Sequence, residues 1–107
     1  MVADPATTLF VARGDGGIVG MLTLATFQLP TGVRAWIEDV VVEGAARGGG
    51  VAVALVQAAL ERSAELGART VDLTSRPHRE AANRLYLRMG FETRQTNVYR
   101  RALGSPG

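Results

Sequence analysis

The stretch from Val40 to Leu66 constrains the fold more than any other part of the chain. It begins with three consecutive valines, which is typical of a strand buried on both faces. It then passes through Arg47 and three glycines into an apolar segment with helical spacing, expected over about 50–66. A short β-branched run, 70–74, follows Gly67 and predicts a second strand. A strand, a helix and a strand in this order predict a β-α-β unit with parallel strands.

The remaining segments extend this unit on both sides. Alternating and β-branched runs separated by glycine turns predict two strands before it, which would pair as a hairpin, and a third that leads into it. A second helix is expected after it, followed by a returning strand or a tight pair of strands. The expected ranges are about 8–12, 18–28 and 34–42 for the strands, 80–89 for the helix and 91–101 for the last strand. The order β-β-β-α-β-α-β predicts a single α/β (α+β) domain over 1–107 with a mixed sheet and a frayed tail at 102–107.

Composition excludes several kinds of site. The chain has no cysteine and one histidine, so we expect no disulfide, no cysteine nucleophile and no metal site. All twelve basic residues are arginine, and the formal net charge is only +2, which is weak support for a nucleic-acid partner. No signal peptide or membrane span is visible in the sequence, so a cytoplasmic location without membrane contact is the expectation.

The glycine segment between strand and helix has two interpretations. The N-terminus of a helix presents unpaired N–H groups and a partial positive charge, and glycine lets an anion approach the backbone closely. Arg47 adds a positive charge at this point. The segment fits neither the lysine-containing phosphate loop nor the dinucleotide fingerprint, since Val53 stands where the latter needs glycine. Taken alone, a flexible linker is as good an interpretation as an anion site.

Two motifs together resemble one known family. The run Arg47-Gly48-Gly49-Gly50-Val51-Ala52 fits the pattern Arg/Gln-x-x-Gly-x-Gly/Ala, and Val42 stands five residues before its arginine. The run from Ala82 to Phe91 fits Ala-x-x-Leu-Tyr-x-x-x-Gly-Phe. Both are similar to motifs of the GNAT superfamily of N-acetyltransferases, and the resemblance covers roughly 8–101. It implies a GNAT-like acyltransferase fold and acetyl-CoA as the cosubstrate.

The resemblance implies a set of cofactor-binding residues. The backbone of the valine strand would pair with the pantetheine arm of acetyl-CoA, and the glycine segment would hold its pyrophosphate. An asparagine contact is weaker here, because the family's asparagine position holds Arg79 in this chain. The residues implied are Val40, Val41, Val42, Arg47, Gly48, Gly49, Gly50, Val51, Ala52 and Asn83.

The resemblance also implies catalytic roles. Tyr86 matches the tyrosine that protonates the departing thiolate, although a tyrosine packed in the core would give the same pattern. Glu38 and Asp39 are candidates for the base that deprotonates the amine, with an arginine-paired or rim carboxylate as the alternative. Strand alternation puts them on opposite faces unless a bulge intervenes. We favour Glu38, which regular alternation places on the face of Trp36, Val40 and Val42.

The chain is short for this family. The usual first strand and the next two helices have no counterpart, so a sheet edge is expected to be exposed, and we predict a homodimer. The leading hypothesis is an acetyl-CoA-dependent N-acetyltransferase that acts on a primary amine of a small molecule through a tetrahedral intermediate. The alternative is a non-catalytic acyl-CoA-binding or regulatory module. A basic nucleic-acid-binding domain is the third. The sequence does not identify the acceptor amine.

Overall fold

Four strands and two helices make up the domain. The structure is a computed structural model, and it describes residues 6–44, 50–75 and 79–104. The elements, in chain order, are β1 (Ala6–Gly14), β2 (Gly17–Leu29), β3 (Gly32–Val42), α1 (Val51–Glu65), β4 (Ala68–Leu73) and α2 (Glu80–Arg88). Each predicted helix, and each strand up to β4, therefore forms at its expected place, with bounds that differ by a few residues.

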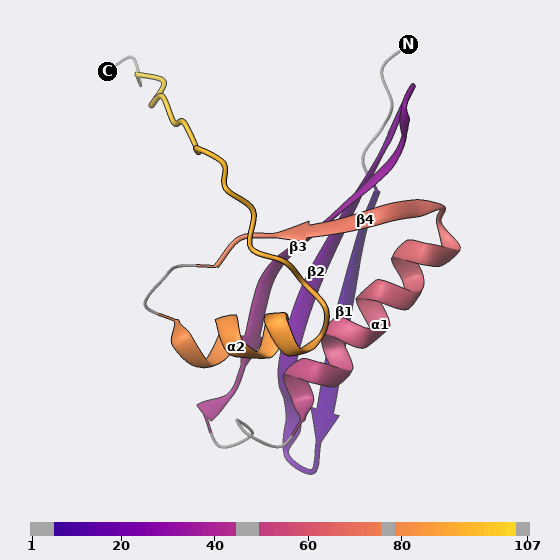
Figure 1. Ribbon diagram of the computed structural model, residues 1–107. Helices are drawn as coiled ribbons and strands as arrows, with labels where there is room; N and C mark the ends of the chain where they lie inside the picture. The colour runs from indigo at the N-terminus through magenta and orange to yellow at the C-terminus, as the bar shows by residue number, and fades with distance from the viewer. Residues whose placement is uncertain (1–5, 45–49, 76–78, 105–107) are drawn as a thin grey trace.

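The sheet is mixed, in the order β1-β2-β3-β4 (Figure 1). β1 pairs with β2 and β2 with β3 in antiparallel fashion, whereas β3 and β4 run parallel. The parallel pair requires a crossover, and α1 supplies it. The expected mixed sheet and β-α-β unit are confirmed.

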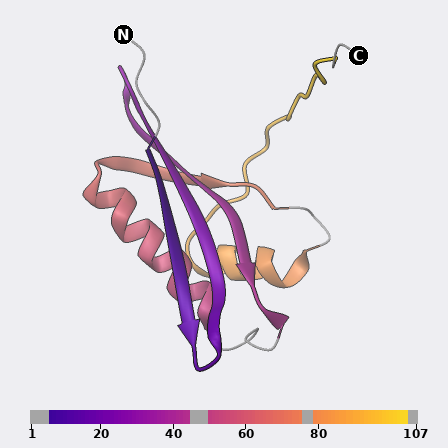
Figure 2. The ribbon, with the colours of Figure 1, turned by 180° about the vertical axis from the view of Figure 1, so that it is seen from behind.

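Both helices cover the same face of the sheet. They lie in front of the strands in Figure 1 and behind them in Figure 2, which shows the molecule from the opposite side. Alternate side chains of β2 point toward the helices, and the core forms there. The buried apolar residues are Leu22, Leu24, Ala35, Ile37, Leu55, Val56, Ala59 and Tyr86. The buried residues of α1 are Leu55, Val56, Ala59 and Ser63.

The predicted last strand does not form. Residues 91–104 contain no helix or strand, and every residue from 92 to 104 is exposed. Phe91 is still anchored, since its N–H donates to the carbonyl of Tyr86 at 3.0 Å. Beyond it the chain runs away from the domain (Figure 1). Strand propensity depends on packing against neighbours, and this segment has no neighbouring strand in the described part of the chain.

The described residues include no helix long and apolar enough to cross a membrane.

Candidate active site

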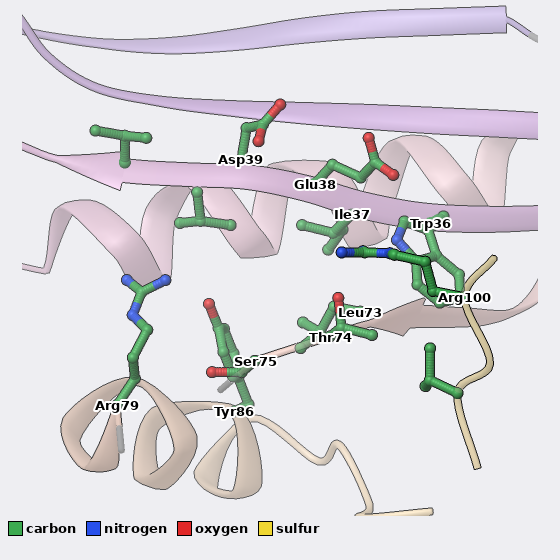
Figure 3. Close-up of a pocket in the computed structure, with 13 residues that line it drawn as sticks. Trp36, Ile37, Glu38, Asp39, Leu73, Thr74, Ser75, Arg79, Tyr86 and Arg100 are labelled. Atoms are coloured by element: carbon green, nitrogen blue, oxygen red, sulfur yellow. The ribbon is translucent and has the colours of Figure 1, made fainter. Parts of the chain in front are cut away.

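The parallel pairing of β3 with β4 ends partway along β3, because β4 ends at Leu73. The ladder between β3 and β4 ends at the pair Ile37–Leu73, and β3 continues to Val42. α2 lies across the gap that this leaves (Figure 3). The result is a pocket of about 930 Å³ in which the β3 segment after Ile37 forms one wall and α2 the other. An open strand edge facing a helix can bind an extended ligand through its backbone groups.

A bulge in β3 decides where the two carboxylates point. Thr23 of β2 pairs with Glu38, and Met21 pairs with Val41. Between these two pairs β2 has one residue and β3 has two, so β3 contains one extra residue, which is a β-bulge. Asp39, at this irregularity, has a positive φ of 53°. Consequently Glu38 and Asp39 are both exposed, and both line the pocket.

The bulge also corrects the predicted face of Glu38. We expected it to share a face with Trp36, Val40 and Val42, which holds for a regular strand. The extra residue reverses the alternation, so Glu38 shares its face with Trp36 and Val41. Val40 and Val42 instead pack against the core. The sequence has no signal that marks a bulge at this position.

Tyr86 places its ring in the core and its hydroxyl in the pocket. The residue is 8% exposed, and its ring meets Phe91 edge to face with centroids 5.9 Å apart. Figure 3 shows the hydroxyl directed toward β3. Burial raises the pKa of Tyr86 above 10.0, and the positive charge of Arg79 partly offsets this rise. Tyr86 can therefore pack its apolar ring in the core and still present its hydroxyl to the pocket.

The start of α1 shows why a glycine is needed there. Gly50 precedes the first helical residue and has φ 83° and ψ 6°, a left-handed conformation that other residues rarely adopt. No side chain caps the first turn, and no acidic residue lies in it. Val51 and Ala52 form its first two positions. Arg47, Gly48 and Gly49 lie outside the described residues.

Several residues that line the pocket were not identified as site residues from the sequence, among them Ser75, Val98 and Arg100. Ser75 follows β4, and its Oγ is buried without a hydrogen-bond partner among the described residues. Val98 and Arg100 of the C-terminal segment also line the pocket, and Figure 3 shows Arg100 there. None belongs to a recognisable motif, and only the tertiary fold brings them to this place.

Asn83 is set back from the pocket. It lies half-buried on α2, one turn before Tyr86, and it is not among the pocket-lining residues. Arg79, which occupies the family's asparagine position, does line the pocket. In the described part of the chain, no group of three or more His, Asp or Glu side chains is placed to hold a metal ion.

Comparison with known proteins identifies the fold. The family model described as "Acetyltransferase (GNAT) family" matches residues 1–91. A transcriptional regulator from Bacillus halodurans C-125 aligns with TM-score 0.79 and 34% identity, covering 90% of this chain and 66% of its own. A protein from Agrobacterium tumefaciens str. C58, named for an inferred acetyltransferase activity, aligns with TM-score 0.84 and 30% identity, covering 92% and 71%. An acetyltransferase from Trypanosoma brucei aligns with TM-score 0.74 and 29% identity, covering 92% and 69%.

The chain thus spans about two-thirds of the length of these solved chains. No curated protein matches it significantly.

Proposed function

Because the chain belongs to the GNAT acetyltransferase family, we propose that it transfers the acetyl group of acetyl-CoA to a primary amine of a small molecule. The observation that carries this proposal is the position of Tyr86. Its hydroxyl faces the open edge of β3 across the pocket that Glu38 and Asp39 also line. Figure 3 shows the two carboxylates directed to the side of β3 away from α2, so the acid and the two candidate bases border the pocket from opposite sides of this strand.

The described residues fit acetyl-CoA as the cosubstrate. The β3 edge after Ile37 offers backbone groups to an extended chain such as the pantetheine arm. The unpartnered Oγ of Ser75 in the wall of the same pocket can hydrogen-bond to the amide groups of that arm. The uncapped start of α1 after Gly50 suits the pyrophosphate, together with Arg47, Gly48 and Gly49. Val40 and Val41 line the wall along which the arm would lie.

The proposed reaction assigns each group one task. Glu38 or Asp39 takes a proton from the acceptor amine, directly or through a water molecule, so that the nitrogen can attack the thioester carbonyl. Neither carboxylate forms an ion pair within the described residues, so each is available as a base. A backbone N–H of the 40–42 segment would stabilise the oxyanion of the tetrahedral intermediate. Tyr86 protonates the departing sulfur.

The pKa of Tyr86 suits this task. Because burial raises it above 10.0, the phenol is fully protonated at neutral pH. A proton is therefore present on Tyr86 when the C–S bond breaks. Proton donation to the sulfur as the C–S bond breaks makes the departure of the thiolate easier.

A non-catalytic acyl-CoA-binding module is the second candidate. The observation that favours it is the similarity to the Bacillus halodurans protein, which is named as a transcriptional regulator and is 34% identical. Such a module would keep the open β3 edge and the start of α1 and would not need the carboxylates.

A calorimetric titration with acetyl-CoA and with CoA, followed by a thiol-release screen over an amine panel, tests the proposal. We expect binding of both nucleotides and release of thiol with at least one amine. Binding without release from any amine would favour the second candidate, and absence of binding would contradict both.

The variant Tyr86→Phe tests the assigned acid. We expect a loss of turnover of about 10²- to 10⁴-fold, the usual contribution of a general acid, with little change in the Kd for CoA. The ring and its contact with Phe91 remain, so the fold should be kept. Exposed Tyr99 provides the matched control, and Tyr99→Phe should turn over like the wild type. Turnover of Tyr86→Phe equal to that of the wild type at every pH would show that the assignment is wrong.

A further inference from the structure

Arg79 is a charged residue that stability does not explain. It is the N-cap of α2, a position where Ser, Thr, Asp or Asn satisfies the free N–H groups of the first turn. Its side chain makes no capping hydrogen bond, and its positive charge lies at the positive end of the helix dipole. Among the described residues it belongs to no ion pair, since the one pair there joins Arg62 and Glu65. The residue is therefore unfavourable for the helix that it begins.

The position of Arg79 relative to Tyr86 suggests a different use. Arg79 directly precedes α2 and Tyr86 follows seven residues later, close to two helical turns, and both residues lie on the side of the helix that borders the pocket. Both line the pocket, and Figure 3 shows both side chains reaching from α2 toward β3. Arg79 lowers the pKa of Tyr86 through its charge, against the larger effect of burial. A guanidinium that borders the same pocket as the phenol favours the ionised form of the phenol.

We propose that Arg79 is a positioning residue that assists proton donation by Tyr86 and stabilises the tyrosinate formed when the thiolate leaves. This inference rests on the proposed function. When the tetrahedral adduct collapses, the carbonyl re-forms and the C–S bond breaks, with its electron pair going to sulfur. The Tyr86 proton moves to that sulfur, and CoA leaves as the thiol. The tyrosinate that remains then takes a proton from solvent water.

The other charged groups around the pocket are less suited to this role. Glu38 and Asp39 are carboxylates on β3, and a negative charge would oppose formation of a tyrosinate. Arg100 enters from the C-terminal segment, and Figure 3 shows it beside Trp36 and Ile37, away from the Tyr86 hydroxyl. The face of α1 that packs near Tyr86 contributes Leu55, Val56 and Ala59, which carry no charge.

The main test measures Tyr86 directly and needs no turnover. The chain has two tyrosines, so Tyr99→Phe leaves Tyr86 as the only one. The absorbance of the Tyr86 tyrosinate is then measured against pH in Tyr99→Phe alone and in Tyr99→Phe combined with Arg79→Asn or with Arg79→Lys. Circular dichroism defines the pH range in which each protein is folded. We expect Arg79→Asn to titrate at higher pH because a positive charge is lost, and Arg79→Lys to resemble the parent. Arg84→Gln, an exposed change of the same charge on α2, should leave the titration unchanged.

Stability and kinetics separate this role from a structural one. Asparagine is a preferred N-cap and removes the unfavourable charge, so the Tm of Arg79→Asn should be equal to or above that of the parent. Its turnover should nevertheless fall by on the order of tenfold. In the pH profile of kcat, the decrease at alkaline pH should move to higher pH, because Tyr86 would lose its proton at higher pH. Arg79→Lys should recover most of the turnover. A substitution that disturbed only the packing would lower the Tm and would not move the alkaline decrease in the pH profile of kcat.

Two results would overturn parts of this account. A Tyr86 titration that is the same in Arg79→Asn and in the parent overturns the role of Arg79, even in an active enzyme. A shifted titration in a protein that transfers no acetyl group overturns the proposed function, and with it the assistance to the leaving thiolate.

Discussion

Tyr86 belongs to the core and to the pocket at the same time. Most of its ring is buried with Leu22, Ile37 and Val56, whereas its hydroxyl reaches the cavity between β3 and α2. The sequence indicated both interpretations, a core tyrosine and an acid, and presented them as alternatives. The structure places the ring in the core and the hydroxyl in the pocket, so a core position does not exclude the proposed role as an acid. Such a group links the chemistry of the site to the stability of the fold.

The burial of Tyr86 predicts a loss of stability in alkaline solution. Its pKa is raised in the folded state above 10.0, mainly by burial, so the folded protein holds the proton more tightly than the unfolded chain. By linkage, the stability is fully present below about pH 10 and falls as the pH rises through the folded-state pKa. Tyr86→Phe has no ionisable hydroxyl at this position, so its free energy of unfolding should decrease less at alkaline pH than that of the wild type.

Urea unfolding at about pH 8 and about pH 11 would measure the effect. Tyr99→Phe is the control, since Tyr99 is 88% exposed and should keep the wild-type dependence. An equal fall in the free energy of unfolding for wild type and Tyr86→Phe would contradict the prediction.

At the scale of the elements, the sequence predicted the regular parts and missed the local irregularities. Glycine turns, β-branched runs and helical spacing were enough to place the elements from β1 to α2. The bulge at Asp39 was not predictable, because it depends on how β3 registers with β2. The strand expected over 91–101 was wrong for a related reason, since its local pattern favours a strand but its position in the fold provides no partner. Ser75 could not be identified, because its importance comes from burial alone.

The packing of α1 on the sheet predicts one position that cannot accept a side chain. A Cβ at Gly20 of β2 would lie 2.8 Å from Val51 Cγ1, 3.1 Å from Leu55 Cδ1 and 3.3 Å from the Val41 carbonyl oxygen. We expect Gly20→Ala to lower the free energy of unfolding by about 1–3 kcal/mol, the usual cost of overpacking. Urea denaturation would measure this.

Gly16→Ala is the matched control, because a Cβ there meets nothing within 4 Å. Adding Val51→Ala to Gly20→Ala removes the nearest atom, so the double variant should lose less than the sum of the two single losses. Gly20→Ala as stable as Gly16→Ala would contradict this account of the contact.

At the scale of the whole molecule, one side of the sheet is open. The helices cover the other side, and β1 is an edge strand of the described sheet. Leu9 and Val11 of β1, with Met21 and Phe27 of β2, are exposed apolar residues on the open face. Apolar patches and unpaired edges of this kind favour association. We therefore propose that two copies associate along β1.

Light scattering after size exclusion tests this association. At micromolar concentration we expect a dimer for the wild type and a monomer for Leu9→Glu, since a charge on an edge strand opposes pairing. Val53→Glu on α1, where Val53 is 41% exposed, should remain dimeric. A monomeric wild type at this concentration would refute the proposal.

The end of the β3–β4 ladder at Ile37 and Leu73 has a consequence for the dynamics of the free protein. Up to that pair, the backbone of β3 lies between two strands, and its amides should exchange with deuterated solvent only when the sheet opens. Beyond it, β4 no longer shields the strand, so protection from exchange should drop along a single continuous β-strand. A ligand bound against Val40 and Val41 would in effect complete the sheet. Occupancy of the site would then be recorded as slowed isotope exchange in the few amides of this segment that point away from β2.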